Sequence, residues 1–543
     1  MSNERPEDQA VLTVPPMKWD AWGAPEKSKT LSDGIKGLLQ QALGVTSRQK
    51  PERMAEEDVI LAPSAVSEGQ LAALAGIVGA KFCSTEHNDR LLRAGGKSTL
   101  DMLRRRSTEP QNAPDVIVTP GTEAEVAEIL RYCADNSIAV VPFGGGTSVV
   151  GGLDPVRDKF DAVLSLDLRR FDSLIDLDTD SSIATLGAGL SGPHAEELLG
   201  ARGFSLGHFP QSFMFATIGG FAATRSSGQA SAGYGRFEDM VQGLRVVTPA
   251  GTLDTGRAPA SAAGPDLGEL FVGSEGTLGV ITQVRVRVHP VPETTVREGW
   301  SFPDFETGAA ALRALRQAGA VPTVLRLSDE AETAVNLATH DKIGEETVTG
   351  GCLAITTFEG TKEHTAERVA EARAVLAANG ATSLGEEPGS NWEHGRYDAP
   401  YLRDALLDAG ALAETLETAT TWGNLANLRA AVTTALTESL SAQGTPPLVL
   451  CHISHTYATG ASLYFTIVCA QNDDPIDQWS KAKTAAGDAI IAAGGTITHH
   501  HAVGVDHRPW MRDEIGDLGV TVLRAVKNAV DPAGVLNPGK LIP

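Results

Sequence analysis

One glycine-rich stretch constrains this chain more than any other feature of its sequence. Residues 144–146 are three consecutive glycines, and they follow the short apolar run 138–141. Glycine adopts positive φ and lets a ligand approach the main chain closely, so several N–H groups can face one anion such as a diphosphate. A glycine-rich surface loop is the plain alternative. The stretch contains Pro142, Phe143, Gly144, Gly145, Gly146, Thr147 and Ser148 and ends at Gly152.

Three more glycine-rich segments follow within residues 210–281. One such motif is weak, but four in this order favour a nucleotide-binding domain. A strand predicted at 115–118, a helix at 123–136 and a strand at 138–142 form a βαβ-like unit that leads into the first stretch. The sequence has no GxGxxG fingerprint there, which argues against a Rossmann-type NAD site.

The order of predicted elements divides the chain into four parts. Alternating valines predict a half-buried strand over 280–288, and Pro290 and Pro292 then end the nucleotide-binding domain. Strands alternate with helices in the next region, including a strand predicted at 462–469. The parts are an N-terminal helical region (1–112), the nucleotide-binding domain (113–290), an α/β cap (291–495) and a C-terminal segment (496–543).

Two features of the N-terminal part carry expectations of their own. Six basic side chains between residues 89 and 106 predict a solvated helix face. Trp19 and Trp22 lie close together, and two large rings favour docking onto the folded body over exposure to water.

Composition excludes several classes of partner. A net charge of −23 disfavours nucleic acid and anionic membrane surfaces. No apolar run approaches the ~18 residues of a membrane span. The first ten residues lack the apolar core of a secretory signal, and the five cysteines form no CxxC pair. We therefore expect a cytoplasmic protein without a cysteine-based metal site.

The four glycine-rich segments together resemble the FAD-binding domain of the vanillyl-alcohol oxidase and p-cresol methylhydroxylase (PCMH-type) superfamily. The resemblance implies an α+β fold, with a PCMH-type FAD-binding domain of two α+β subdomains. It also implies that the first stretch holds the FAD diphosphate and that the other segments line the flavin and ribityl chain. Residues 142–152 contain no His or Cys, and His208 reads as a loop histidine, so we expect non-covalent FAD. The predicted cofactor residues beyond the first stretch are Gln211, Ser212, Thr217, Gly219, Thr224, Arg225, Ser226, Ser227, Glu275, Gly276, Thr277, Leu278, Gly279, Val280 and Ile281.

Three adjacent histidines near the C-terminus form a second constellation. His499, His500 and His501 precede Ala502. They are compatible with a metal site or with an active-site loop that binds anions and moves protons. No further cluster of ligands is evident in the sequence, so we predict no metal.

This histidine loop, with Trp510 after it, resembles that of the alkyldihydroxyacetonephosphate synthases, which belong to the same superfamily. Matching segments run in order from Lys18 through 401–404 and 414–422 to 460–465. The resemblance implies exchange of the acyl chain of acyl-dihydroxyacetone phosphate for a fatty alcohol, with no net redox change and with the flavin as an electron sink.

The resemblance also implies residue roles. Tyr464 handles the substrate proton, which requires a lowered phenol pKa; Arg403 binds the phosphate; Arg326 supports the site; and the three histidines hold substrate and assist proton transfer. Each has a structural alternative: a core aromatic for Tyr464, an ion pair with Asp404 or Asp408 for Arg403, and a surface charge for Arg326. We further expect a homodimer that contacts membranes peripherally through an apolar surface of the cap.

Two other functions remain open at this level. The segment from Asn537 to Lys540 is more typical of FAD-linked dehydrogenases or oxidases of 2-hydroxy acids such as D-lactate or glycolate. A flavin-binding protein without catalysis would fit if Tyr464 lay far from the flavin site.

Overall fold

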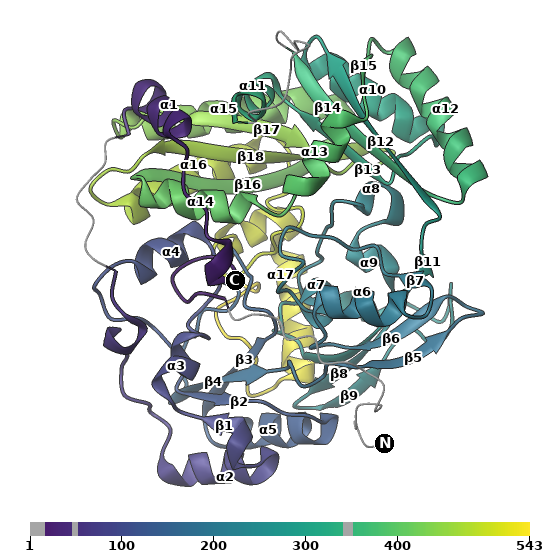
Figure 1. The fold of residues 1–543 in the computed structure, drawn as a ribbon. Helices are drawn as coiled ribbons and strands as arrows, with labels where there is room; N and C mark the ends of the chain where they lie inside the picture. The colour runs from purple at the N-terminus through teal and green to yellow at the C-terminus, as the bar shows by residue number, and fades with distance from the viewer. Residues whose placement is uncertain (1–16, 46–52, 340–350) are drawn as a thin grey trace.

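The computed structural model contains two bodies, one above the other in Figure 1, with the C-terminal segment running between them. The lower body holds strands β1 to β11, and the cap holds β12 to β18. The structure describes residues 17–45, 53–339 and 351–543. The stretch on which the expectation of no secretory signal rests lies outside the described residues.

The lower body begins with a four-stranded sheet in the order β1-β2-β4-β3. Its elements are β1 (Cys83–Ser84), β2 (Val116–Val118), α5 (Glu123–Asp135), β3 (Ile138–Phe143) and β4 (Ala162–Asp167). β2 and β3 both run parallel to β4, and α5 buries Val126, Ile129 and Leu130 against them. The predicted βαβ-like unit is confirmed. Phe143 pairs with Asp167, so the glycine-rich stretch leaves the sheet at the edge where both strands end.

A second sheet has five antiparallel strands in the order β5-β6-β10-β8-β9, and the short strands β7 (Phe204–Ser205) and β11 (His289–Pro290) pair with each other. Its strands and helices are β5 (Leu174–Asp178), β6 (Ile183–Gly187), α6 (Gly192–Gly200), α7 (Ile218–Ala223), β8 (Val241–Thr248), β9 (Gly251–Asp254) and β10 (Val280–Arg287). Phe221 of α7 and Val284 of β10 belong to one buried cluster. The two α+β subdomains expected from the sequence are both present.

The cap is built on a seven-stranded sheet in the order β15-β12-β14-β13-β17-β18-β16, with every pair antiparallel. Its strands are β12 (Thr294–Phe302), β13 (Val324–Ser328), β14 (Cys352–Gly360), β15 (Thr382–Gly385), β16 (Ala411–Thr421), β17 (Leu448–Ile453) and β18 (Gly460–Ala470). Its helices are α10 (Phe305–Ala318), α11 (Glu330–Thr339), α12 (Lys362–Ala378), α13 (Glu387–Gly395), α14 (Ala399–Asp408), α15 (Leu425–Ala442) and α16 (Pro475–Ala492).

Alternation along the cap strands separates an apolar face from a polar one. Phe465 and Ile467 of β18 join the core formed with α15 and α16. Their neighbours Tyr464 and Thr466 point to the opposite face, because successive strand residues alternate sides. The polar face of the sheet lines the cavity described below.

The N-terminal segment contacts both bodies. α1 (Asp33–Leu43) packs on the cap near α14, and α2 (Glu68–Val78) packs on the four-stranded sheet. Trp19 and Trp22 are buried, which confirms that this segment docks onto the folded body.

The prediction of a solvated basic helix face over residues 89–106 is wrong. Arg90, Lys97 and Arg105 are 6%, 5% and 6% exposed. The Lys97 ammonium donates to the carbonyls of Trp19 at 3.2 Å and Ala21 at 3.0 Å. Arg105 and Arg106 likewise donate to the carbonyls of Trp19 and Asp20, so three of the six basic side chains fasten the N-terminal segment, while Arg104 stays exposed. The six basic residues belong to α3 (His87–Leu91), α4 (Thr99–Arg105) and their flanking loops.

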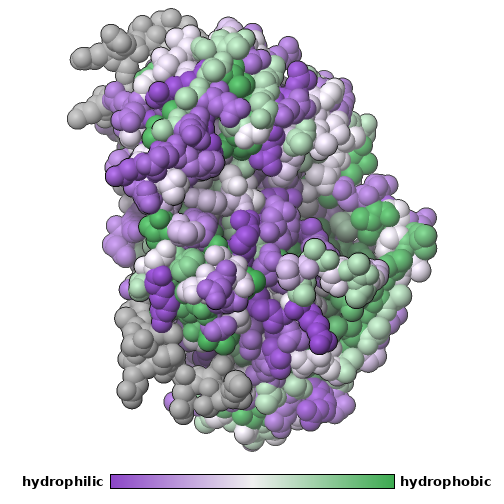
Figure 2. Space-filling view, turned by 90° about the vertical axis from the view of Figure 1, so that its right-hand side faces the viewer, coloured by the Kyte–Doolittle hydropathy of each residue, from purple (hydrophilic) through white to green (hydrophobic). Residues whose placement is uncertain are grey.

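The C-terminal segment ends in α17 (Met511–Val530) and a tail that returns to the lower body, where Leu536 bridges to Val140 of β3. No helix among the described residues is long and apolar enough to cross a bilayer. Figure 2 shows one face of the molecule with hydrophilic residues over most of it and hydrophobic residues gathered towards its right-hand edge.

Candidate functional site

A cavity of about 480 Å³ lies where the polar face of the cap sheet meets the lower body. The glycine-rich stretch forms one wall, α14 another, and Tyr464 and His500 a third. A volume of this size suits a cofactor or a substrate of drug size or larger.

The first glycine-rich stretch is closely packed against the loop before α7. A Cβ on Gly145 would lie 2.0 Å from the Phe215 carbonyl oxygen, and one on Gly144 would lie 2.4 Å from the Thr217 hydroxyl oxygen. Only glycine permits this approach. All seven residues predicted from this stretch, Pro142 to Ser148, line the cavity.

Most of the other predicted cofactor residues line the same cavity. Four do not. Arg225 turns outward and pairs with Glu269 at 2.7 Å, while Thr277, Leu278 and Val280 are buried in the core behind the wall. The predicted residues that line it are Gln211, Ser212, Thr217, Gly219, Thr224, Ser226, Ser227, Glu275, Gly276, Gly279 and Ile281.

The polar atoms of this wall fit a bound FAD. Gln211 Nε2, Ser227 Oγ and Gln229 Oε1 line the cavity, are buried, and have no hydrogen-bond partner within the described residues. Buried polar atoms without partners are costly, so these atoms indicate a polar ligand. Together with the narrow glycine approach, they match the phosphate and ring groups of FAD.

His208 has a structural role. Its Nε2 lies 3.0 Å from Ser226 Oγ, and its ring packs edge-on against Phe221 and Phe237. Burial lowers the pKa of His208 to about 3, so it is neutral. It does not line the cavity, in agreement with FAD held without a covalent bond to this residue.

Tyr464 lies on β18, opposite His452 of β17 on one side and Glu417 of β16 on the other. Its ring stacks on His452 with centroids 4.7 Å apart and lies edge-on to His501 at 5.6 Å. Burial raises the pKa of Tyr464 to about 12. The expected lowering of this pKa is therefore not present in the protein alone, where the phenol is protonated at neutral pH.

The two predicted substrate arginines both reach the cavity. Arg403 of α14 donates to the Lys97 carbonyl at 2.6 Å and to Asp404 at 3.1 Å. The ion pair considered as its alternative is thus present, and the guanidinium still faces the cavity. Arg326 of β13 donates to Glu332 at 2.6 Å and contacts His452 Nδ1 at 2.9 Å.

Glu417 holds the histidine loop in place. Its carboxylate accepts hydrogen bonds from the backbone N–H groups of His499, His500 and His501 at 2.5, 3.1 and 2.9 Å. Burial would raise the pKa of Glu417, but the facing histidines and hydrogen bonds leave it well below its usual value. One buried carboxylate thus orders three consecutive residues.

The three loop histidines are not equivalent. His500 and His501 line the cavity, whereas His499 lies behind them between the Tyr457 hydroxyl and His500 Nδ1. Burial lowers the pKa of all three imidazoles, which favours their neutral form.

Sequence reasoning missed Glu417, His452, His455 and Glu332. His452 and His455 line the cavity beside Tyr464, and Glu332 pairs with Arg326 and His452. Only their place in the sequence could have identified them, because Glu417 and the two histidines lie inside or beside segments that resemble the synthases.

Known proteins match the chain over most of its length. A family model described as FAD binding domain matches residues 114–256, and one described as FAD linked oxidases, C-terminal domain, matches residues 291–541. The alkyldihydroxyacetonephosphate synthase of Dictyostelium discoideum is 36% identical over 84% of this chain and 77% of its own length. That of Trypanosoma brucei brucei is 34% identical over the same shares.

A solved structure supports the same assignment. An alkyldihydroxyacetonephosphate synthase superposes with a TM-score of 0.84 at 30% sequence identity, covering 97% of this chain and 99% of the other. FAD is thus the cofactor that both the cavity and the family models indicate. The chain belongs to the alkyldihydroxyacetonephosphate synthase family of FAD-dependent enzymes.

Proposed function

We propose that this enzyme exchanges the acyl chain of acyl-dihydroxyacetone phosphate for a fatty alcohol, which gives an ether and a free fatty acid. The observation that carries the proposal is the convergence of Tyr464, Arg403 and His501 on the cavity that the glycine-rich stretch also lines. Family membership supports the same reaction, because the relatives are synthases of this name.

Arg403 is proposed to bind the substrate phosphate. A guanidinium presents paired N–H donors that match phosphate oxygens. Asp404 and the Lys97 carbonyl fix its orientation from behind. Leu402, Leu406 and Val468 line the same part of the cavity and offer an apolar surface to the fatty chains.

Tyr464 and His501 are proposed to move the proton at C1 of the substrate. As the Tyr464 oxygen takes up the C1 proton, its own phenol proton passes to the neutral His501 imidazole, and the reverse transfers return a proton to C1. Bound FAD supplies an electron sink at the substrate carbon. His499 lies behind the cavity wall, so its role in this proposal is to position His500 rather than to touch substrate.

Replacing the phenol tests these roles. We expect Tyr464→Phe to keep its flavin absorbance and melting temperature but to lose about 10²- to 10⁴-fold in ether-forming turnover, the usual range for a general acid–base group. Tyr397→Phe is the matched control, because its buried hydroxyl has no partner among the described residues and does not line the cavity. Unchanged turnover in Tyr464→Phe would remove this residue from the reaction.

We also propose a cytoplasmic homodimer that contacts membranes peripherally. The five free cysteines suit a reducing compartment. The apolar contact that the structure offers lies on α17 of the C-terminal segment rather than on the cap: Leu518 and Val522 are 76% and 50% exposed and lie four residues apart on one helix face. Light scattering tests the dimer, and sedimentation with lipid vesicles tests the membrane contact.

A further inference from the structure

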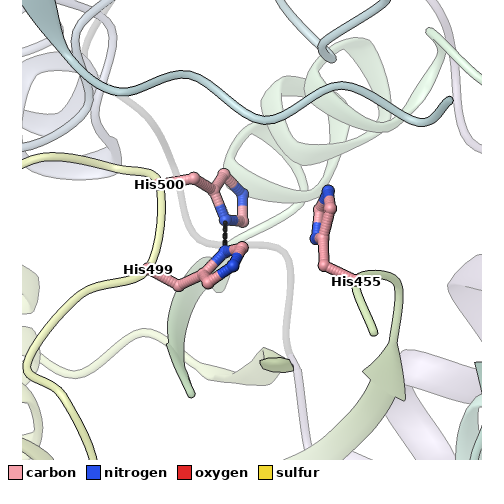
Figure 3. A group of neighbouring side chains, drawn as sticks. All are labelled: His455, His499 and His500. Carbon is pink, nitrogen blue, oxygen red and sulfur yellow. Dashed lines mark hydrogen bonds between the residues drawn. The ribbon is translucent and has the colours of Figure 1, made fainter. Parts of the chain in front are cut away.

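His455, His499 and His500 face a common space beside the cavity. Figure 3 shows the three rings, with His455 in the turn after β17 and the other two on the C-terminal loop. One nitrogen from each ring lies within 4.8 Å of the others, and no other residue of the described chain joins this group. His455 and His499 are buried and His500 is partly buried, which favours the neutral imidazole that binds metal ions.

The spacing of these rings matches a metal centre. A Zn–N bond of ~2.0–2.1 Å and a tetrahedral angle place the centroids of two ligating imidazoles about 5.2 Å apart. The three centroid distances are 5.0 Å for His455 and His499, 5.4 Å for His455 and His500, and 5.3 Å for His499 and His500. His499 Nδ1 and His500 Nδ1 are 3.0 Å apart, close to the separation of two nitrogens on one ion.

Outer contacts orient two of the rings as metal-binding histidines require. His455 Nε2 lies 3.2 Å from the Gly228 carbonyl, and His499 Nε2 contacts the Tyr457 hydroxyl. Both contacts leave Nδ1 as the nitrogen with the lone pair, since the partnered Nε2 carries or shares the proton. Around His455 Nδ1 lie the hydroxyl oxygens of Ser454 at 2.9 Å and Ser462 at 3.4 Å, and a metal ion on this nitrogen would take the place of the hydroxyl proton. Glu417 adds a negative charge 3.6 Å from His500 Nδ1, which offsets the nearby Arg236 guanidinium bound to the His499 carbonyl.

We propose that His455, His499 and His500 bind a divalent transition-metal ion, Zn²⁺ in the first place, with a fourth position open to the cavity. His455 and His500 line that cavity, which provides the entry path. Three imidazoles with one open position are typical of zinc that binds a water or substrate oxygen. The sequence alone indicated no metal here, because His455 is 44 residues away from the loop. The metal site uses neither Tyr464 nor His501, the two groups proposed to move the substrate proton.

Metal content of the purified flavoprotein tests this directly. The protein is dialysed against Zn²⁺ and then against metal-free buffer, and bound zinc is measured by mass spectrometry. We expect one zinc per chain in the native protein and His501→Gln, and less than a tenth of that in His455→Gln and His500→Gln. Tyr457→Phe removes an outer contact and is expected to weaken zinc binding by about 10- to 100-fold.

X-ray absorption at the zinc edge gives a second reading on the native protein, which needs no variant to fold. Three imidazole nitrogens at about 2.0 Å are expected. Absence of zinc after dialysis would overturn the site, as would equal zinc content in the native protein and in folded, flavin-loaded His455→Gln and His500→Gln.

Discussion

At the scale of single residues, Glu417 decides whether the histidine loop keeps its shape. Its carboxylate accepts from three consecutive backbone N–H groups and from the Thr498 hydroxyl at 2.6 Å. A carboxylate in this position has no substitute among neutral side chains, because an amide would turn a donor toward some of these donors.

We expect Glu417→Gln to lower the free energy of unfolding by about 3–5 kcal/mol, the range for removing one partner of a buried charged pair. Ether-forming activity should fall with it, since His500 and His501 lose their positions. Urea unfolding and a turnover assay measure the two effects. Glu438→Gln, on the exposed side of α15, should change neither. A stable, active Glu417→Gln variant would contradict this role.

Glu332 predicts a specific dependence of stability on pH. Burial alone would raise its pKa, but His452 and Arg326 lower it to about 2, below the ordinary value of 4.5. The ionised carboxylate therefore stabilises the folded state. Its contribution is complete above about pH 4.5 and is lost as pH falls toward 2.

We expect Glu332→Gln to cost about 3 kcal/mol of unfolding free energy at neutral pH, the equivalent of this pKa shift. The difference from the native protein should shrink as the pH is lowered from 5 to 3. Denaturant titrations at several pH values measure it. A difference that stays constant or grows over that range would show that Glu332 is not the group responsible.

Single residues also mark what the sequence could and could not predict about the site. The glycines and the histidine loop can be recognised in the sequence by their unusual composition, and Tyr464 by its resemblance to the synthases. Glu417 does not, because a glutamate 82 residues before its partner carries no local signal. The raised pKa of Tyr464 likewise depends on burial, which only the folded cap creates.

At the scale of elements, strands with regular alternation are the ones that the sequence predicts well. β10 and β18 match their predicted ranges within a few residues. β16 is harder to predict because it contains the polar residues Glu414, Thr415, Glu417 and Thr418. These residues interrupt the alternation of apolar and polar side chains that identifies a strand. In the cap, β16 is nevertheless packed between α14 and β18. The local sequence also does not indicate whether neighbouring strands run parallel or antiparallel. The antiparallel order of the cap sheet is therefore visible only in the structure.

In the loop before α4, a clear sequence pattern leads to a wrong prediction: a run of basic residues is expected to face solvent. Lys97 belongs to a basic stretch, yet its ammonium is buried among backbone carbonyls of the N-terminal segment. Burial lowers the pKa of Lys97 well below its usual value. A run of basic residues is exposed to solvent only when no backbone carbonyl groups from another segment pack against it.

We expect Lys97→Met to loosen the segment around Trp19 and Trp22, because the carbonyls of Lys18 and Ala21 lose their side-chain donor and the Trp19 carbonyl keeps only Arg105. Hydrogen exchange in residues 17–24 should quicken, and the free energy of unfolding should fall by about 1–3 kcal/mol for the unpaired buried carbonyls. Lys81→Met, at an exposed position, is the control. Unchanged exchange in this segment would mean that Lys97 does not hold it.

At the scale of the whole molecule, the site exists only because two bodies meet. Trp22, Ser148, Tyr464 and His500 come from four distant parts of the chain and line one cavity. From the sequence, the cofactor is expected in the FAD-binding domain, Tyr464 in the cap and the histidine loop in the C-terminal segment. The sequence could not predict that the cap sheet turns its polar face to the glycine-rich stretch, since that depends on how complete surfaces pack.

One assay separates ether formation from the oxidation of a 2-hydroxy acid. The flavin-loaded protein is incubated with acyl-dihydroxyacetone phosphate and a radiolabelled long-chain alcohol, without an electron acceptor. Parallel samples receive D-lactate or glycolate with a reducible dye. We predict that label enters an alkali-stable ether and that an equal amount of fatty acid is released, while the dye stays oxidised. Dye reduction by either hydroxy acid, with no labelled ether, would contradict the proposed ether formation.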